Sequence, residues 1–326
     1  MLKNVGKTED ILKGFSSEVI SFPNDYEGVV LATLVSKMCP NPSKKAVLYI
    51  HGYSDYFFQS ELADFYLSQD INFYALDLRK YGRSWMPHQH FNFCKDMHEY
   101  YAELDAAVDM IRRRDGNTWL LLNGHSTGGL LAAIYAHDRS SDGFIDALFL
   151  NSPFFDFNKD IFTKLFAKVM VTPIGRMSPF FVVGTGALPL YGESVHKDYK
   201  RGGTFVFNED WKPVRKWKPM VCAGWIRAIR LAQIRVQSGL GIQVPTLLMR
   251  SDKSGGGPSW NDTFENSDCV LNVEDMQAHG KKLNKGQDLF TQIVIKNGMH
   301  DLACSRQEPR KDFYLALQGW IKKHSP

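Results

Sequence analysis

The sequence predicts an α/β fold, in which a mostly parallel sheet carries helices on both faces. Three observations predict it. Short apolar runs recur along the chain, helical patterns separate them, and a serine between glycines stands where one run meets a helix. Continuously apolar runs are typical of strands that are buried on both faces of a parallel sheet. Strands that alternate with helices favour an open sheet covered on both sides.

The first two strands are expected to form a hairpin. The runs "FSSEVISF" and "GVVLATLVSK" have strand composition, and the turn-forming stretch "PNDYEG" separates them. Six apolar runs follow and complete an expected sheet of eight strands. They are residues 46–50, 71–78, 119–123, 147–151, 245–250 and 291–296.

Helical patterns lie between these runs. In residues 97–114, apolar side chains recur at helical spacing, with charged side chains opposite. Residues 311–323 predict the last helix in the same way. The small residues that follow position 126 predict a helix that packs closely against the sheet.

One long segment interrupts the alternation. Residues 158–242 contain no strand pattern of the same quality and are too long for an ordinary connection. We therefore expect a mainly helical cap at 158–242, inserted between two core parts at 1–157 and 243–326. Its aromatic residues would line a substrate pocket or form the cap's own core. They include Phe162, Phe166, Phe180, Phe181, Trp211, Trp217 and Trp225.

Composition narrows the functional classes. A content of 44% hydrophobic and 13% aromatic residues excludes a disordered chain. The net charge of +4, without a long basic run, argues against a dedicated nucleic-acid binder. We expect neither a signal peptide nor a membrane span, because no suitable apolar stretch occurs. The five cysteines are scattered without a CxxC pair, which indicates reduced thiols in a cytoplasmic protein.

Residues 124–128, Gly-His-Ser-Thr-Gly, fit the pattern G-x-S-x-G at the junction of an apolar run and a helix. This pattern is typical of a strained turn that raises a serine hydroxyl above the sheet edge, with Gly124 and Gly128 avoiding clashes. Ser126 is therefore the candidate nucleophile. The alternative is an ordinary Ser/Gly cap of a helix.

A serine hydroxyl needs a base that removes its proton, and the base needs a carboxylate that orients it. His300 follows the last predicted strand in "IKNGMHDLACS" and is the candidate base. Two carboxylates follow the seventh strand. Asp268 in "NSDCVLNVEDM" is preferred, because one helix and one strand fill the span from there to His300. Asp252, directly after the strand, is the second choice.

The chain order Ser126, Asp268, His300 is that of the α/β-hydrolases. The stretch "YIHGYSDY" resembles the family's His-Gly motif, and "LDLRKYGRS" resembles its Asp-x-Arg-Gly-x-Gly-x-Ser segment, with Lys80 where glycine is usual. Together with "GHSTGG", "SDCVLNVEDM" and "GMHDLACS", these motifs resemble the monoacylglycerol lipase, lysophospholipase and serine aminopeptidase branch. The resemblance covers the core on both sides of the cap.

This resemblance implies an α/β-hydrolase fold and an oxyanion hole. Its donors would be the backbone N–H groups of Tyr53 and Thr127, with His51 and Gly52 supporting the loop that carries Tyr53. Asp77, Arg79 and Ser84 are expected to brace the loop beneath the site. They are structural in this interpretation.

The functional hypothesis is a serine hydrolase that cleaves carboxylic esters through an acyl-enzyme, without a metal or organic cofactor. The alternatives are a lipid-directed monoacylglycerol lipase or lysophospholipase, and a non-catalytic ligand-binding receptor on the same fold. An aminopeptidase would need an acidic cluster in the cap, and the acidic residues there are dispersed. They are Asp156, Asp160, Glu193, Glu209 and Asp210.

The expected partner is a small-molecule ester, with acyl lipids among the candidates, and no nucleic acid. The basic amphipathic pattern of residues 225–236 allows at most peripheral membrane contact. The stretch "HQHFNFCKDMH" contains His88, His90, Cys94 and His98, but its spacing fits no metal signature, so no metal is predicted. The sequence does not predict the oligomeric state.

Overall fold

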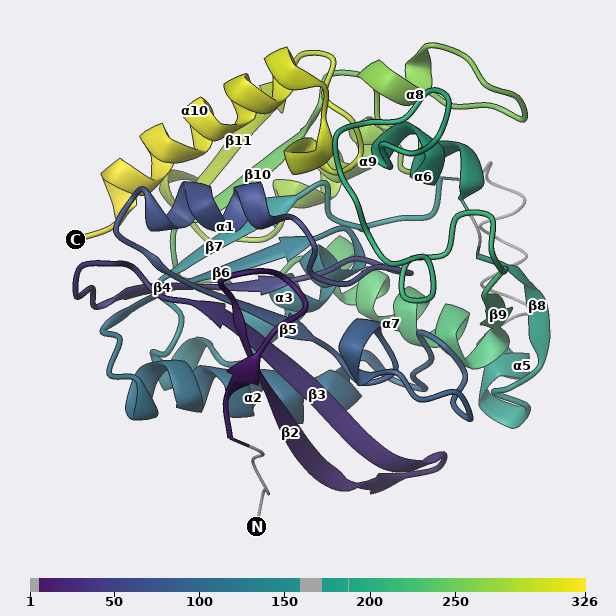
Figure 1. Cartoon of the computed structure of the whole chain (residues 1–326), viewed down its shortest axis with the longest axis horizontal. Helices are drawn as coiled ribbons and strands as arrows, with labels where there is room; N and C mark the ends of the chain where they lie inside the picture. Colours follow the sequence, from purple (N-terminus) through teal and green to yellow (C-terminus); the bar gives the residue numbers. More distant parts are fainter. Residues whose placement is uncertain (1–5, 159–171, 187) are drawn as a thin grey trace.

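A computed structural model describes residues 6–158, 172–186 and 188–326. Nine of the described strands form one sheet, in the order β1-β2-β3-β5-β4-β6-β7-β10-β11 (Figure 1). They are β1 (Thr8–Glu9), β2 (Ser16–Asp25), β3 (Gly28–Lys37), β4 (Lys45–Ile50), β5 (Asn72–Asp77), β6 (Trp119–His125), β7 (Ala147–Asn151), β10 (Thr246–Ser251) and β11 (Phe290–Ile295). The six strands from β5 to β11 in this order are parallel, and β1, β2 and β3 add an antiparallel edge.

All eight expected strands are present, but the expected number is one too low. The additional strand, β1, contains two exposed residues that pair with the start of β2. Two exposed residues carry no hydrophobic pattern, so the sequence offered no signal for them. The strands predicted from continuous apolar runs are buried along nearly their whole length, except β11 at the sheet edge.

Helices cover both faces of the sheet (Figure 1). The described α-helices are α1 (Ser60–Leu67), α2 (Tyr101–Asp109), α3 (Thr127–Asp138), α5 (Thr172–Met177), α6 (Pro189–Val195), α7 (Ala223–Ser238), α8 (Thr263–Asn266), α9 (Val273–Gly280) and α10 (Gln307–His324). The apolar sides of α1 and α10 form a core with one face of the sheet, whereas α2, α3 and α7 pack on the other face. The helix predicted at 97–114 is helical throughout, with a 3-10 turn before α2 and a π-helical turn after it.

The segment between β7 and β10, residues 158–242, is called the cap segment below. Its described part contains α5, α6, α7 and an antiparallel pair of strands, β8 (Val182–Thr185) and β9 (Met220–Cys222). The sequence did not predict this pair, because both strands are very short and β8 is exposed along its whole length. Phe162, Phe166 and Asp160 lie outside the described residues. No helix in the described part of the chain is long and apolar enough to cross a membrane.

Lys80, which replaces the glycine usual in the family, joins the loop after β5 to the hairpin of β2 and β3. Its φ angle of 64° lies in the left-handed region that favours glycine. The side chain is fully buried, and its Nζ lies 2.8 Å from Asp25 Oδ2 and 2.5 Å from Glu27 Oε2. The ammonium also lies over the ring of Tyr26, 4.3 Å from its centroid. Buried ion pairs therefore accompany the unfavourable backbone conformation at this position.

We expect Lys80→Met to lower the free energy of unfolding by about 3–5 kcal/mol, because two buried carboxylates would lose their cation. Urea denaturation measures the change. Lys37→Met is the control, since Lys37 forms a similar pair with Asp64 whose side chains are 30% and 60% exposed. That pair contributes about 0–1 kcal/mol. Equal stability losses in the two variants would contradict a stabilising role for the Lys80 cluster.

Candidate active site

Ser126 lies on the turn that joins β6 to α3. Its φ of 52° and ψ of −115° are rare for a residue with a side chain. Such a conformation costs about 1–3 kcal/mol and persists only where the surrounding structure holds it. The Ser126 N–H donates to the carbonyl of Asn151 at 3.0 Å, and the Ser126 carbonyl accepts from Phe154 N–H at 3.0 Å. Backbone hydrogen bonds to the chain at the end of β7 thus hold the turn.

Glycines bring this turn against the loop after β4. A Cβ on Gly128 would overlap the carbonyl groups of Ile50 and His51, so only glycine allows this approach. A Cβ on Gly52 would lie 3.2 Å from Ser126 Cβ. Gly124 faces the Gly128 carbonyl across the same turn. The loop that carries Tyr53 therefore packs directly on the serine turn.

His300 connects Ser126 to Asp268. Its Nδ1 lies 2.9 Å from Asp268 Oδ2, and its Nε2 lies 3.0 Å from Ser126 Oγ. All three side chains are buried. The second oxygen of Asp268 accepts the N–H groups of Val270 at 2.9 Å and Leu271 at 2.7 Å, which fixes the carboxylate. With Nδ1 donating to the carboxylate, Nε2 can accept the proton of the serine hydroxyl.

Asp252, the second choice for the acid, does not contact His300. It is exposed and lies at the end of β10. Its Oδ1 accepts the Asn297 N–H at 2.8 Å, and its own N–H donates to the Ile295 carbonyl at 3.1 Å. These bonds support the turn that follows β11. The structure therefore brings Asp268, and not Asp252, to His300.

The two candidate oxyanion donors come from different elements: Tyr53 lies on the loop after β4, and Thr127 begins α3 directly after the serine. His51 Nδ1 donates to the Gly52 carbonyl at 2.8 Å, and its Nε2 accepts the Leu78 N–H at 3.1 Å. Burial lowers the pKa of His51, which favours this neutral form. Tyr53 and Thr127 line the same cavity as Ser126. Neither of their N–H groups donates to a protein acceptor within the described ranges.

Of the three residues expected to brace the loop beneath the site, Asp77 and Ser84 form hydrogen bonds within and next to the loop after β5. Asp77 is fully buried, and its carboxylate accepts Phe57 N–H at 3.0 Å and Arg83 Nη1 at 2.8 Å. Ser84 Oγ donates to the Asp77 carbonyl at 2.8 Å. Arg79 instead pairs with Glu103 of α2. These groups hold the loop after β5 beneath the site and do not line the cavity.

Sequence reasoning missed Asp301, the residue beside the candidate base. Its buried carboxylate accepts Asn151 Nδ2 at 2.8 Å and Gln59 Nε2 at 2.9 Å, and its N–H donates to the Tyr191 hydroxyl at 3.0 Å. The available signal was an acid followed by the apolar residues Leu302, Ala303 and Cys304, because such a setting indicates burial and a buried carboxylate requires hydrogen-bond partners. Asp301 fixes the loop that carries His300.

A cavity of about 390 Å³ lies beside Ser126 and His300. Most of its wall is apolar and comes from the core loops and the cap segment: Phe154, Phe157, Leu188, Val214, Val221, Trp225, Ile226, Val270 and Leu271. Asp55 and Lys212 also line the cavity and form an ion pair with each other. The sequence analysis expected aromatic residues of the cap segment to line a pocket or to form the cap's own core. Among those that the structure describes, Trp225 lines this cavity. Trp211 packs on Tyr56 and Trp217 on Trp85 instead.

The histidine-rich stretch of residues 88–98 does not assemble into one group. His90 Nδ1 lies 2.7 Å from Glu27 Oε1, and His98 Nδ1 lies 2.6 Å from Asp96 Oδ1. Cys94 is buried in the core. The side chains of this stretch therefore have separate structural partners.

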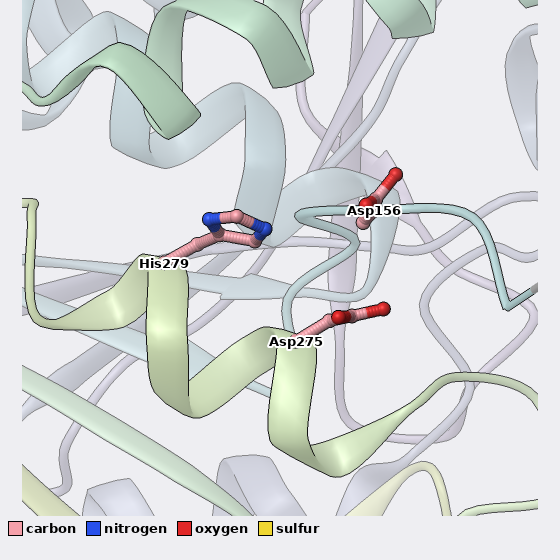
Figure 2. Close-up of side chains that lie close together, drawn as sticks. All are labelled: Asp156, Asp275 and His279. Carbon is pink, nitrogen blue, oxygen red and sulfur yellow. The ribbon is translucent and has the colours of Figure 1, made fainter. Parts of the chain in front are cut away.

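Figure 2 shows a different group, Asp156, Asp275 and His279. Each offers one atom that could bind a metal, a carboxylate oxygen or an imidazole nitrogen, and these atoms lie within 4.8 Å of one another. Asp275 and His279 lie one turn apart on α9, and Asp156 follows β7. Arg230 Nη1 lies 3.4 Å from Asp156 Oδ1, so a protein cation already accompanies this carboxylate. None of the three lines the cavity. We assign the group neither a metal nor a part in the chemistry at Ser126.

The parallel sheet, the serine turn after β6 and the histidine after the last strand define an α/β-hydrolase. The family model described as serine aminopeptidase, S33, matches residues 41–253, and the chain belongs to this family. The match includes Ser126 and ends before Asp268 and His300. It confirms the family resemblance predicted from the sequence. No curated protein sequence gives a significant match.

Solved structures share the fold. A soluble variant of monoglyceride lipase from Saccharomyces cerevisiae, in complex with a substrate analog, is 14% identical with a TM-score of 0.67; 100% of this chain and 97% of that chain are covered. The monoacylglycerol lipase of Paleococcus ferrophilus is 17% identical with a TM-score of 0.62, covering 90% and 99%. Est1E from Butyrivibrio proteoclasticus with bound ferulic acid is 16% identical with a TM-score of 0.55, covering 90% and 96%.

Proposed function

We propose that the protein is a serine hydrolase that cleaves carboxylic esters through an acyl-enzyme. The observation that carries the proposal is the hydrogen-bonded connection of His300 to both Ser126 and Asp268 beside an apolar cavity. Ser126 Oγ attacks the ester carbonyl while His300 Nε2 takes its proton and passes it to the leaving alkoxide. Asp268 stabilises the imidazolium. Water then releases the acid from the acyl-enzyme, with His300 again acting as base.

The N–H groups of Tyr53 and Thr127 would hold the oxyanion of the tetrahedral intermediate. The N–H group of Thr127 is at the start of α3, where amides lack intrahelical acceptors and the helix dipole favours negative charge. One preorganised donor of this kind contributes about 2.7–4 kcal/mol to the stability of the transition state.

Ester substrates are favoured over peptides with a free amino terminus. The described acidic residues of the cap segment, Glu193, Asp198, Glu209 and Asp210, do not line the cavity beside Ser126, and each has a protein partner. Glu193 pairs with Arg215 at 2.7 Å, Asp210 pairs with Lys216, and Glu209 accepts from Tyr199 at 2.5 Å. This arrangement supports hydrolysis of esters rather than recognition of a substrate amine.

A lipid-directed enzyme, such as a monoacylglycerol lipase or lysophospholipase, is the second candidate. Large apolar side chains are exposed on α5, β8 and β9 and on the link between α5 and β8; these elements lie together at one end of the molecule (Figure 1). They include Met177, Phe181, Val182, Val183 and Met220. Thr185 and Val221 of the same strands line the cavity, so the exposed apolar residues adjoin it. Exposed apolar patches of this kind support peripheral contact with a lipid surface.

Turnover of aryl esters of increasing acyl length, from acetate to palmitate, tests the proposal. We expect multiple turnovers, with the highest kcat/KM for short and medium chains. The reason is the cavity volume of about 390 Å³, which is near the lower end of the range of about 300–1,000 Å³ for small-molecule sites. A preference for long chains presented in micelles would favour the lipid-directed enzyme. Saturable binding without turnover would contradict a hydrolase and indicate a receptor.

We also propose a cytoplasmic location. All five cysteines are in the described part of the chain, and all are free thiols. Disulfides are rare in the cytosol, so this state fits a reducing compartment.

A further inference from the structure

We propose that the buried ion pair between Asp55 and Lys212 positions the N–H group of Tyr53, so that the cap segment completes the oxyanion hole. This inference rests on the proposed function, because a positioned oxyanion donor matters only if the enzyme attacks a carbonyl. Asp55 and Lys212 would be positioning residues that act through the loop of residues 51–55.

One residue of this loop has a strained backbone conformation. Ser54, directly after Tyr53, has a φ of 52°, a left-handed value that is costly for a residue other than glycine. Its Oγ is buried and has no hydrogen-bond partner in the described structure. The bonds of His51 to Gly52 and Leu78 hold the beginning of the loop from the core side. The end of the loop therefore depends on other contacts.

The ion pair is one of the contacts at the end of the loop. Lys212 Nζ lies 2.8 Å from Asp55 Oδ1, and the two side chains are only 14% and 3% exposed. The ammonium also lies 5.5 Å from the ring centroid of Phe58 and 5.7 Å from that of Phe207. Burial of an ion pair costs desolvation free energy, so net stability is a weak reason for its presence. Fixed geometry at the cavity wall is the stronger reason.

Three further contacts join the cap segment to the same stretch of chain. The ring of Tyr53 packs on Trp225 of α7, with 4.3 Å between ring centroids, and a Cβ on Gly186 would overlap the Tyr53 phenol. The Asn208 N–H donates to the Tyr56 hydroxyl at 2.7 Å. Residues 53, 55 and 56 thus contact three different parts of the cap segment. The core, through His51, and the cap segment, through residues 53, 55 and 56, therefore both set the position of the Tyr53 N–H group.

Such positioning has a kinetic signature. A displaced oxyanion donor weakens binding of the tetrahedral transition state and leaves binding of the ground-state ester nearly unchanged. The effect therefore falls on kcat. If the pair instead bound a polar group of the substrate, its loss would raise KM.

The test compares Lys212→Met, Asp55→Asn and the double variant with wild type, using an aryl ester that the wild type hydrolyses. We expect kcat to fall about 10- to 100-fold, with KM within about threefold. Affinity for a trifluoromethyl ketone, which forms a tetrahedral oxyanion adduct with the serine, should fall by the same factor. Lys212→Arg keeps the pair and should retain most of the activity. Thermal denaturation verifies that each variant is folded.

Arg235→Met is the matched control. Arg235 of α7 pairs with Asp138 of α3, with distances of 2.5 and 2.9 Å, and so joins the cap segment to the core away from the cavity. Its loss should leave kcat unchanged. An equal loss of kcat in this control, or a raised KM with unchanged kcat in Lys212→Met, would overturn the inference. If the wild type is active and kcat of the Lys212 and Asp55 variants is unchanged, the inference is wrong and the proposed function stands. If the wild type hydrolyses no ester, both the inference and the proposed function are wrong.

Discussion

Ser126→Ala is expected to lower kcat for ester hydrolysis by about 10⁵- to 10⁶-fold. The variant lacks the attacking oxygen, and His300 Nε2 loses its hydrogen-bond partner at 3.0 Å. The backbone bonds of the turn to Asn151 and Phe154 do not involve the hydroxyl, so the fold should persist. Substrate binding should persist too, because the apolar cavity wall is unchanged. Steady-state kinetics on the preferred aryl ester measures the loss.

Ser194→Ala is the control for this experiment. Ser194 is a fully buried serine of α6 whose Oγ donates to the Tyr191 carbonyl at 2.7 Å, and it does not line the cavity. Its kcat should stay close to wild type. Labelling with a fluorophosphonate and mass spectrometry of the peptides gives an independent reading, with the adduct expected on Ser126. An adduct on another serine, or substantial turnover by Ser126→Ala, would exclude Ser126 as the nucleophile.

Much of the core was predictable because strands buried on both faces leave a local signature. Residues 28–37 and 147–151 coincide with β3 and β7, and the run at 119–123 lies within β6. The serine turn was equally visible, since the close approach of backbones around Ser126 demands glycines at fixed offsets. By contrast, β1, β8 and β9 are short and partly or wholly exposed, and such strands carry no hydrophobic pattern.

Contacts between distant parts of the chain were not predictable from one sequence. Asp301 depends on Gln59 and Asn151, and Asp55 depends on Lys212; no local pattern connects these partners. Lys80 was noticed as a departure from the family motif, but its pairing with the hairpin acids could not be inferred. Tertiary packing chooses such partners, so only the structure reveals which buried charges neutralise one another.

The choice of acid is a related case, because Asp268 and Asp252 both follow β10 and the sequence preferred Asp268 only from its spacing to His300. The structure supports Asp268, and we expect Asp268→Asn to lower kcat by about 10⁴-fold. The amide cannot stabilise the imidazolium. If its NH₂ donates to His300 Nδ1, the proton moves to Nε2, which then cannot accept from Ser126. The N–H groups of Val270 and Leu271 can still bond the amide oxygen, so the fold should persist.

Asp252→Asn is the matched comparison, since it makes the same chemical change on a carboxylate after the same strand. An amide oxygen can still accept the Asn297 N–H, and the side chain is exposed, so the effect on stability should stay within about 0.5 kcal/mol. Activity should remain within about threefold of wild type, because Asp252 does not contact His300 and its exposed side chain is easily replaced. Kinetics of both variants on one ester decides between the two residues. Loss of activity in Asp252→Asn with activity retained in Asp268→Asn would assign the acid to Asp252, and the hydrogen bond between His300 and Asp268 would then be structural.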